Sequence, residues 1–439
     1  MILIETITAL IGIYLLVKEV SIYRFRNYAT SVFLLCFVPL LCIYPLISRI
    51  VVGGAYSVQP GDYLVFSDYS VYLVYQAFCL GILWMVYLTG GRQTLTPSPE
   101  WRSVIDTNIA ELAIVVAIIS LGIALYVRST GFTVGELITA SRFEWFNNSS
   151  YSSAIFVVSS YLMTLSPVGL LLAIYKKRYR WVFFLIVAEL IFFGILSKDR
   201  KWLIYILSAG FAFVYYHQNF AIKLQKKFLV IAAMIVSALV FWQVFRGVYF
   251  EYFLTGKGDV SYLAQEMAIE LLTRGDFPYY YNASITAINM NINHDYFIPL
   301  GLLSRQFLFF LPADYSFGLK VEDISALFSD ALQAGDAVRR GNMPPGLFGL
   351  FVISFGWFGG IILCALIPLL LRWLDRYIQK ASGIGSFVLA AHMMSAVLLL
   401  LRGDDSSATY FIVFSLAVFL LIRPNTVIGT RRVESAGNQ

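Results

Sequence analysis

Long apolar segments alternate with short polar segments along most of the 439-residue chain. A helix needs about 20 apolar residues to cross the hydrocarbon core of a bilayer. By that measure the pattern predicts eleven spans, at residues 2–18, 31–48, 69–90, 109–127, 153–175, 181–197, 202–217, 228–245, 346–371, 384–401 and 408–423. We therefore expect an all-α polytopic integral membrane protein.

One segment interrupts this pattern. Residues 246–345 are polar and contain eleven carboxylates among several arginines. The chain is accordingly expected to consist of a membrane domain of eight spans (1–245), this large loop, a membrane domain of three spans (346–423) and a tail (424–439).

Three parts of the large loop have patterns of their own. Residues 260–273 and 321–333 place apolar side chains at helical spacing and predict short amphipathic helices. Residues 296–312 are strongly apolar, but they contain Arg305 and are flanked by prolines. Because this stretch is short for a span, we expect a re-entrant or interfacial segment, whose backbone must be satisfied by protein or water.

The basic residues predict the orientation of the chain. One alternate set of short loops holds 18 Lys and Arg residues, against 7 in the opposite short loops. Basic residues collect on the cytoplasmic side of membrane proteins. The N-terminus and the large loop are therefore expected outside, and the C-terminus is expected in the cytoplasm.

Composition argues against several other classes of protein. Charged residues are only 13% of the chain, about half the share in soluble domains. The net charge of +6 comes from short clusters between apolar segments, so no nucleic-acid partner is expected. The cysteines lie in apolar segments and the three histidines are scattered, so the sequence predicts neither a disulfide framework nor a metal site.

Several arginines on the outward side run against the bias of basic residues toward the cytoplasm. Two interpretations of them remain open. They pair with nearby carboxylates or lipid headgroups, or they bind a phosphate-bearing substrate, because a guanidinium suits bidentate recognition of phosphate. The residues concerned are Arg200, Arg246, Arg274, Arg305, Arg339, Arg340 and Arg402.

Two ionisable residues lie near the middle of predicted spans. Glu189 is in the sixth span and His392 is in the tenth. Ionisable groups at this depth face a cavity or a partner, because their burial in lipid is costly. A direct chemical role and a hydrogen bond to a neighbouring helix both satisfy that requirement.

The arginine-containing stretches carry a family resemblance. Over about residues 194–422 the chain resembles bacterial O-antigen or repeat-unit polysaccharide polymerases of the Wzy type, nearest the enterobacterial-common-antigen branch. The matching stretches include LTRGDF at Arg274, LLSRQFLFFLP at Arg305, MPPGLFGLFVISFGWFGG, LLRWLDRYI and LLLRGDDSS at Arg402. Some of these polymerases have two spaced Arg–Gly motifs, of which only one spacing, that of Arg340 and Gly356, occurs here.

The resemblance implies a GT-C-like glycosyltransferase of the bacterial inner membrane that needs no cofactor. It would transfer a growing glycan from undecaprenyl diphosphate to a new lipid-linked repeat unit at the periplasmic face, in a system with a flippase and a chain-length regulator. Arginines would stabilise the leaving diphosphate and a carboxylate would take the acceptor proton. The expected catalytic residues are Arg274, Arg305, Arg402, Asp276, Asp404 and Asp405, and the expected diphosphate-binding residues are Arg200, Arg246 and Arg340.

Two alternatives remain open. An O-antigen ligase, or another lipid-linked-sugar transferase, would use the same donor; ligases of this kind place a histidine in the large outward loop, where only His294 is available. A flippase or transporter of the lipid-linked glycan is expected to show repeat symmetry and interrupted helices in matching halves of the chain, and the sequence pattern indicates neither.

The topology can be tested with single cysteines placed in the large loop. We expect Gly258→Cys and Gly335→Cys to react with a membrane-impermeant thiol reagent in cells whose outer barrier has been permeabilised. Labelling that appears only after the inner membrane is broken would contradict the orientation.

Overall fold

The computed structural model describes residues 1–56, 58, 65–90, 109–133, 135–136, 153–192, 202–218, 222, 237, 259, 276–308, 324–332, 343–380, 384–404 and 413. In this part of the chain the regular structure is helical, apart from one isolated bridge between Tyr56 and Val65. Within these described ranges, three helical stretches are long and apolar enough to cross a membrane: Tyr28–Val52, Tyr69–Thr89 and Gly346–Gln379. The chain is thus an all-α protein with helices that can span a membrane, whereas the count of eleven spans and the GT-C-like arrangement stay predictions.

The chain separates into two compact units. Unit 1 comprises Met1–Gln93, Ile222–Trp373 and Val397–Ser406, and unit 2 comprises Thr94–Ala221, Leu374–Ala396 and Ser407–Gln439. These units cut across the four segments expected from the sequence, whose boundaries describe membrane topology and stay predictions.

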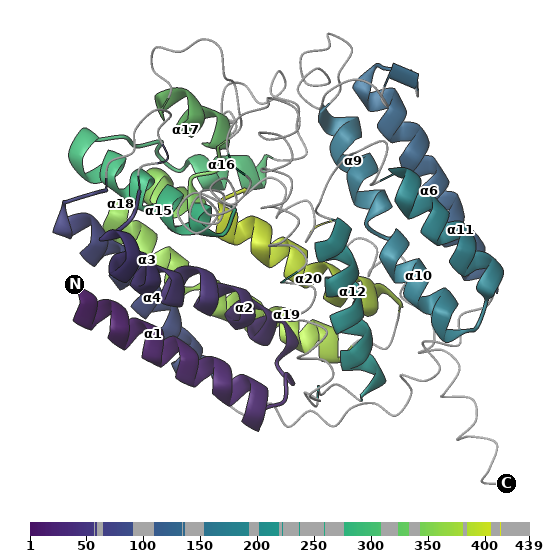
Figure 1. The fold of residues 1–439 in the computed structure, drawn as a ribbon, viewed down its shortest axis with the longest axis horizontal. Coiled ribbons are helices and arrows are strands. Elements are labelled where there is room, and N and C mark those ends of the chain that lie inside the picture. The colour runs from purple at the N-terminus through teal and green to yellow at the C-terminus, as the bar shows by residue number, and fades with distance from the viewer. Residues whose placement is uncertain are drawn as a thin grey trace, which may run out of the picture. The chain divides into compact units, whose positions relative to one another are not determined.

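Unit 1 contains most of the described helices, which appear in purple and green in Figure 1. They are α1 (Ile2–Val17), the π-helical turn η1 (Lys18–Ile22), α2 (Tyr28–Phe37), the π-helical turn η2 (Val38–Ile43), α3 (Tyr44–Val52), α4 (Tyr69–Thr89), α15 (Asp276–His294), α16 (Gly301–Phe307), α17 (Ile324–Leu332) and α18 (Gly346–Ala365).

Unit 2 contains α6 (Ile109–Thr130), α9 (Ser153–Met163), α10 (Ser166–Tyr175), α11 (Tyr179–Glu189) and α12 (Trp202–His217). The helices α19 (Ile367–Lys380) and α20 (Ile384–Arg402) each contribute residues to both units.

The helices of unit 1 alternate in direction. Glu5 near the start of α1 pairs with Arg49 near the end of α3, and Arg49 lies over the ring of Tyr72 near the start of α4. At the other end of α1, Glu19 in η1 lies 3.9 Å from Arg372 in α19. This is the alternation that the sequence predicts for these spans; which end faces the cytoplasm stays a prediction.

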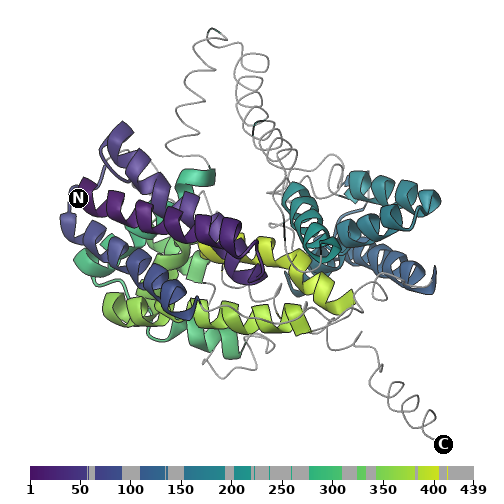
Figure 2. The same ribbon diagram turned by 90° about the horizontal axis from the view of Figure 1, so that it is seen from below.

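The tightest packing in unit 1 joins α15 to α18. Small residues face each other there: a Cβ added to Gly349 would stand 2.5 Å from the Cβ of Ala287, and Gly346 lies against Ser284. Residues 281–288 of α15 are all buried. The two helices lie side by side in Figure 1 and Figure 2. Close approach through small residues is a common way for helices to associate in membranes. Lipid is as apolar as the side chains, so van der Waals packing rather than the hydrophobic effect stabilises the pair.

An aromatic cluster fills the space between α2, α4, α15 and α18. The ring of Phe348 stacks on Phe78 at 4.9 Å and meets Tyr75 edge-on at 4.9 Å. Tyr75 in turn meets Tyr281 of α15 at 5.0 Å. Ring pairs at these distances stabilise a core beyond simple burial, so the cluster fixes α15 against the long helices.

Two helices are interrupted inside apolar segments, a feature that the sequence pattern alone did not indicate. The predicted span 153–175 is broken at Thr164 and Leu165, because Pro167 has no N–H to bond the carbonyl of Met163. In α18, Gly356 has φ 69° and ψ 169°, a conformation that ends one helical segment and starts another.

Only part of the large loop lies within the described residues. The amphipathic helix predicted at 321–333 is confirmed as α17, which buries Ile324, Phe328 and Leu332. The helix predicted at 260–273 lies outside the described residues. The sequence analysis missed α15, whose first residue is Asp276.

Candidate functional site

Arg402 is held in place by the way α20 ends. Gly403 has φ 82°, its N–H bonds to the carbonyl of Leu400 at 2.9 Å, and the N–H of Asp404 bonds to the carbonyl of Leu399 at 3.0 Å. This pair of bonds is a Schellman motif, which needs a left-handed residue directly after the helix. The glycine of the LLRGDD stretch therefore makes Arg402 the last helical residue and fixes its backbone.

The Arg402 side chain lies against an aromatic ring rather than a carboxylate. Its Cζ is 5.6 Å from the ring centroid of Tyr279 on α15. The Tyr279 hydroxyl donates a 2.8 Å hydrogen bond to the carbonyl of Pro344, which fixes the ring. Burial raises the pKa of Tyr279, while the charge of Arg402 lowers it. Arg402 is half-buried and makes no hydrogen bond or ion pair with another described residue, so within the described part of the chain its guanidinium donors are available to an oxygen-rich ligand.

The start of α18 lies directly beside this arginine. A Cβ on Gly403 would come within 2.6 Å of the backbone nitrogen and oxygen of Gly346, so the end of α20 and the start of α18 are in backbone contact. The N-terminus of a helix carries a partial positive charge and unbonded N–H groups. Arg402 and the first turn of α18 therefore present positive charge at one place, an arrangement suited to an anion.

A second predicted arginine, Arg305, lies on the short helix α16 and is half-buried. The break at Gly356 makes this placement possible, because it frees carbonyls inside α18. The N–H groups of Ile298 and Leu300 bond to the carbonyls of Ile353 and Ser354 at 2.8 and 2.9 Å. Protein thus satisfies the backbone ahead of α16, as a re-entrant segment requires.

The structure places the remaining candidates unevenly. Asp276 begins α15, one turn before Tyr279, and Asp404 is half-buried directly after the end of α20. The structure thus brings Arg402, Asp404 and the α15 turn that starts at Asp276 into one region of unit 1. Five predicted site residues lie outside the described residues, namely Arg200, Arg246, Arg274, Arg340 and Asp405.

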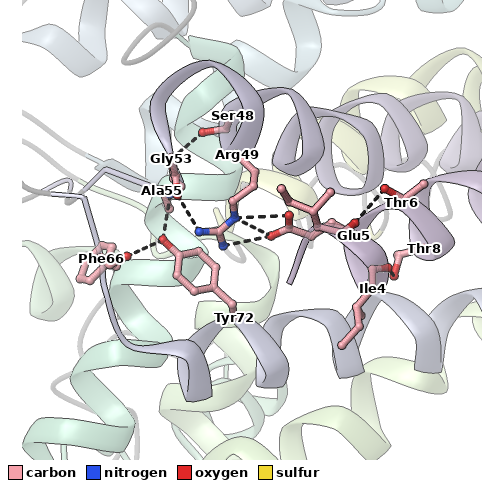
Figure 3. A network of polar contacts seen from close by, with 12 residues as sticks. Ile4, Glu5, Thr6, Thr8, Ser48, Arg49, Gly53, Ala55, Phe66 and Tyr72 are labelled. Carbon is pink, nitrogen blue, oxygen red and sulfur yellow. Dashed lines mark hydrogen bonds and ion pairs between the residues drawn. The ribbon is translucent and has the colours of Figure 1, made fainter.

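A buried ion pair, which the sequence analysis missed, lies elsewhere in unit 1. Arg49 binds both oxygens of Glu5, through Nε at 3.2 and 3.3 Å and through Nη2 at 3.0 Å. It also donates from Nη1 to the carbonyl of Gly53 at 2.6 Å, and its Cζ is 4.0 Å from the ring centroid of Tyr72. Figure 3 shows the guanidinium enclosed by these groups. Because its charge is compensated and its donors are engaged, Arg49 is a structural residue.

The segment that follows α3 and the Arg49 ion pair is hydrogen-bonded to α15. The N–H of Tyr56 bonds to Asn282 Oδ1 at 3.2 Å, and the N–H of Val58 bonds to Thr286 Oγ1 at 3.2 Å. Farther along, Asn293 donates to Asp68 at 3.0 Å. Hydrogen bonds from Ser70 and Asn293 lower the pKa of Asp68. These contacts hold α15 in one position, and with it the ring of Tyr279.

The two ionisable residues inside predicted spans both bond to the broken helix of unit 2. Ser166 donates to Glu189 at 3.0 Å. The Thr164 hydroxyl donates its proton to the carbonyl of Tyr161 at 2.6 Å. Its oxygen therefore acts as the acceptor for Nε2 of His392, 3.0 Å away, and this assigns the ring proton to Nε2. Both residues thus have hydrogen-bond partners on a neighbouring helix. This favours a structural role for Glu189 and His392 over the direct chemical role that the sequence also allowed.

Sequence signals existed for some of the missed residues. Asp276 and Pro278 match the start of a helix, with an acidic residue and a proline in the first turn. Glu5 is a carboxylate inside the first apolar segment. Like Glu189, it needs a partner there, because burial of an unpaired ionisable group is costly. The identity of that partner, Arg49, depends on the packing of α1 against α3 and had no local signal.

The buried ion pair should behave as a stability element. Glu5→Gln or Arg49→Gln leaves one buried group without its partner, so each should destabilise the protein by about 3–5 kcal/mol. The double variant should be less destabilised than the sum of the two. Thermal unfolding of the purified protein in detergent measures this, with Arg24→Gln, at an exposed position, as the control. Strict additivity would show that the two residues do not interact.

Comparison of the chain with models of protein families, with curated proteins and with solved structures finds no match in any of the three.

Proposed function

We propose that this protein is a membrane glycosyltransferase that polymerises lipid-linked oligosaccharide repeat units. It transfers a growing glycan from undecaprenyl diphosphate to a new lipid-linked unit at the periplasmic face of the bacterial inner membrane. The observation that carries the proposal is the environment of Arg402, a half-buried arginine with an aromatic support and no carboxylate partner among the described residues, beside the start of α18. The sequence resemblance supplies the substrate class.

The proposed reaction is a displacement at the anomeric carbon of the growing chain. A hydroxyl oxygen of the acceptor sugar forms the new glycosidic bond, and the bond between the anomeric carbon and the diphosphate oxygen breaks. The diphosphate leaves with the electron pair, while the hydroxyl proton passes to a carboxylate. Arg402 stabilises the developing negative charge of the diphosphate, the type of interaction that contributes most in many enzymes.

Asp404 and Asp276 are candidate carboxylates because of their places next to Arg402 in the sequence and on α15. Asp404 follows it by two residues, and Asp276 begins the helix whose Tyr279 contacts it. A general base must lie within hydrogen-bond reach of the proton that it takes. In the proposal these two residues, together with Asp405, are the candidates for that role, and Arg305 on α16 and Arg274 are further arginines that contact the diphosphate.

One structural observation favours the transporter alternative. Membrane transporters use interrupted helices near their substrate sites, and this chain has interruptions at Thr164–Leu165 and at Gly356. The interruption at Gly356 also has a role in the transferase proposal, because it anchors the segment that carries Arg305. The two functions therefore have to be separated by experiment.

Loss of the protein separates the proposed functions in cells. If it is a polymerase, its deletion should leave single repeat units on the surface lipid and remove the ladder of longer chains. Loss of a ligase would also remove the single-unit band, and loss of a flippase would leave the units inside the cell. Gel analysis of the lipopolysaccharide distinguishes the three, and disappearance of the single-unit band along with the ladder would contradict the polymerase.

Purified variants test the proposed site. We expect Arg402→Lys and Arg305→Lys to lose about ten- to hundredfold in polymerisation rate, because each charged hydrogen bond to the diphosphate contributes about 1.5–3 kcal/mol and a lysine cannot bind it in a bidentate manner. Tyr279→Phe keeps the ring under Arg402 and should retain most activity, whereas Tyr279→Leu should lose it.

The matched control for these variants is Arg339→Lys, at a polar position where the sequence predicts a solvated side chain. The assay uses lipid-linked repeat units with protein amounts matched. Near-normal rates for the Lys variants of Arg402 and Arg305 would mean that these residues supply only net charge and that the assigned site is wrong.

A further inference from the structure

Arg372 is buried without hydrogen-bond partners. Its side chain is 7% exposed, and none of its three guanidinium nitrogens has a hydrogen-bond partner in the described part of the chain. The one carboxylate nearby, Glu19, lies 3.9 Å away, and its oxygens accept from Asn27 at 3.3 Å and from Ser31 at 3.2 Å. A guanidinium has five N–H donors, and leaving them unsatisfied in a buried place is costly.

A second cation lies at the same end of unit 1. The Lys18 ammonium is 5.6 Å from the ring centroid of Tyr23 and 5.7 Å from that of Tyr87. The Tyr23 hydroxyl donates to the carbonyl of Gly90, and a Cβ at Gly90 would lie 3.6 Å from Nη2 of Arg372. Lys18 and Arg372 are therefore grouped around the end of α4, with Tyr23 and Gly90 between them.

The charges of these three residues do not balance. Among the contacts described for Arg372 and Lys18, the carboxylate that opposes them is Glu19, which leaves one positive charge in the group of three. Burial raises the pKa of Glu19, although Arg372, Asn27 and Ser31 oppose the rise. The carboxyl is thus more readily neutral than an exposed one, which reduces its repulsion of an anion. One added negative charge would balance the two cations and the carboxylate.

The simpler explanation is that Arg372 interacts only with the negative end of the α4 dipole. A cation at a helix C-terminus is favourable. That explanation leaves the donors unexplained, because Arg372 bonds to none of the carbonyls of that last turn. A ligand with several acceptor oxygens accounts for both the charge and the free donors.

The geometry points to a phosphate-binding site formed by Arg372 and Lys18, and we propose that its occupant is the phosphodiester of a membrane phospholipid. A guanidinium matches phosphate oxygens in a bidentate manner, and a lysine adds a point charge. Tyrosines such as Tyr23 and Tyr87 collect at the level of lipid headgroups, and basic pockets between helices bind anionic headgroups. The site is separate from the proposed transferase site.

The separation follows from the two ends of α4. Tyr281, two residues after the Tyr279 that contacts Arg402, packs on Tyr75 near the start of α4, whereas Arg372 lies beside Gly90, directly after the end of α4. From residue 75 to residue 90 a helix rises about 22 Å. The two sites thus belong to opposite ends of unit 1, and either proposal can fail without the other.

Binding to the full-length protein tests this inference. The probes are a short-chain phosphatidylglycerol, inorganic phosphate, and a diacylglycerol with the same acyl chains, each added to delipidated protein in a phosphate-free detergent. Native mass spectrometry reports bound lipid, and the rise in thermal unfolding midpoint with ligand concentration gives the affinity. We expect the wild type to bind phosphatidylglycerol but not diacylglycerol.

Variants assign the binding to the site. Arg372→Gln should weaken binding of phosphatidylglycerol by about tenfold or more, and Lys18→Gln should weaken it by a smaller factor. Glu19→Gln removes the opposing charge and should strengthen binding, a result that a purely structural role for these residues would not give. Arg376→Gln, at an exposed position of the same helix, should bind like the wild type.

Several results would overturn the inference. They are equal binding of diacylglycerol, absence of binding by the wild type, and wild-type affinity in the Lys18 and Arg372 variants. If Arg372→Gln does not fold, the half-exposed Lys18 and the opposite effect expected at Glu19 still decide the question. Binding of inorganic phosphate without phosphatidylglycerol would support the anion site and contradict the lipid as its occupant.

Discussion

The close approach of α15 to α18 is the contact on which the rest of unit 1 depends. It is possible only because Gly346 and Gly349 face Ser284 and Ala287, where a larger side chain would overlap its neighbour. A packed interior has no room to absorb an added methyl group without moving a helix. Several otherwise unrelated contacts then follow from the one position of α15.

Those contacts lead in different directions from the same helix. Tyr279 reaches Arg402 at the end of α20, while Tyr281 reaches the aromatic cluster on α4. Asn282 and Thr286 bond to the segment that follows α3. A shift of α15 would therefore disturb the candidate site, the aromatic core and the loop beside the Arg49 ion pair together.

Three arginines of unit 1 differ mainly in how their charge is compensated. Arg49 has a bidentate carboxylate and a carbonyl, Arg402 has an aromatic face, and Arg372 has a carboxylate at 3.9 Å and no hydrogen bond. A guanidinium whose donors are engaged stabilises the fold, whereas one whose donors are free is available to a ligand. The sequence alone ranks these residues poorly, because pairing depends on which helix ends meet.

The long apolar helices were predictable, and the elements that build the site were not. The predicted span 69–90 matches α4 almost residue for residue, because an uninterrupted apolar segment of that length has no other stable arrangement in a membrane. The place of Arg402 at a helix end was also predictable, because the glycine that follows it permits the left-handed backbone conformation at the end of α20. By contrast α15 is rich in Asn, Tyr and Ser and has no strong apolar stripe, so the sequence signals its start at Asp276 and Pro278 but not its extent, which depends on tertiary packing.

The break at Gly356 links two arginines that lie far apart in the sequence. The first segment of α18 runs from Gly346 to Phe355, a length of about 15 Å. Its start contacts the residue after Arg402, and its last carbonyls hold the segment that precedes Arg305. A short helical segment without a break is rigid, so the anchoring points of the two arginines keep a fixed separation. In the proposed site, a movement of this segment therefore shifts the backbone anchors of both arginines together.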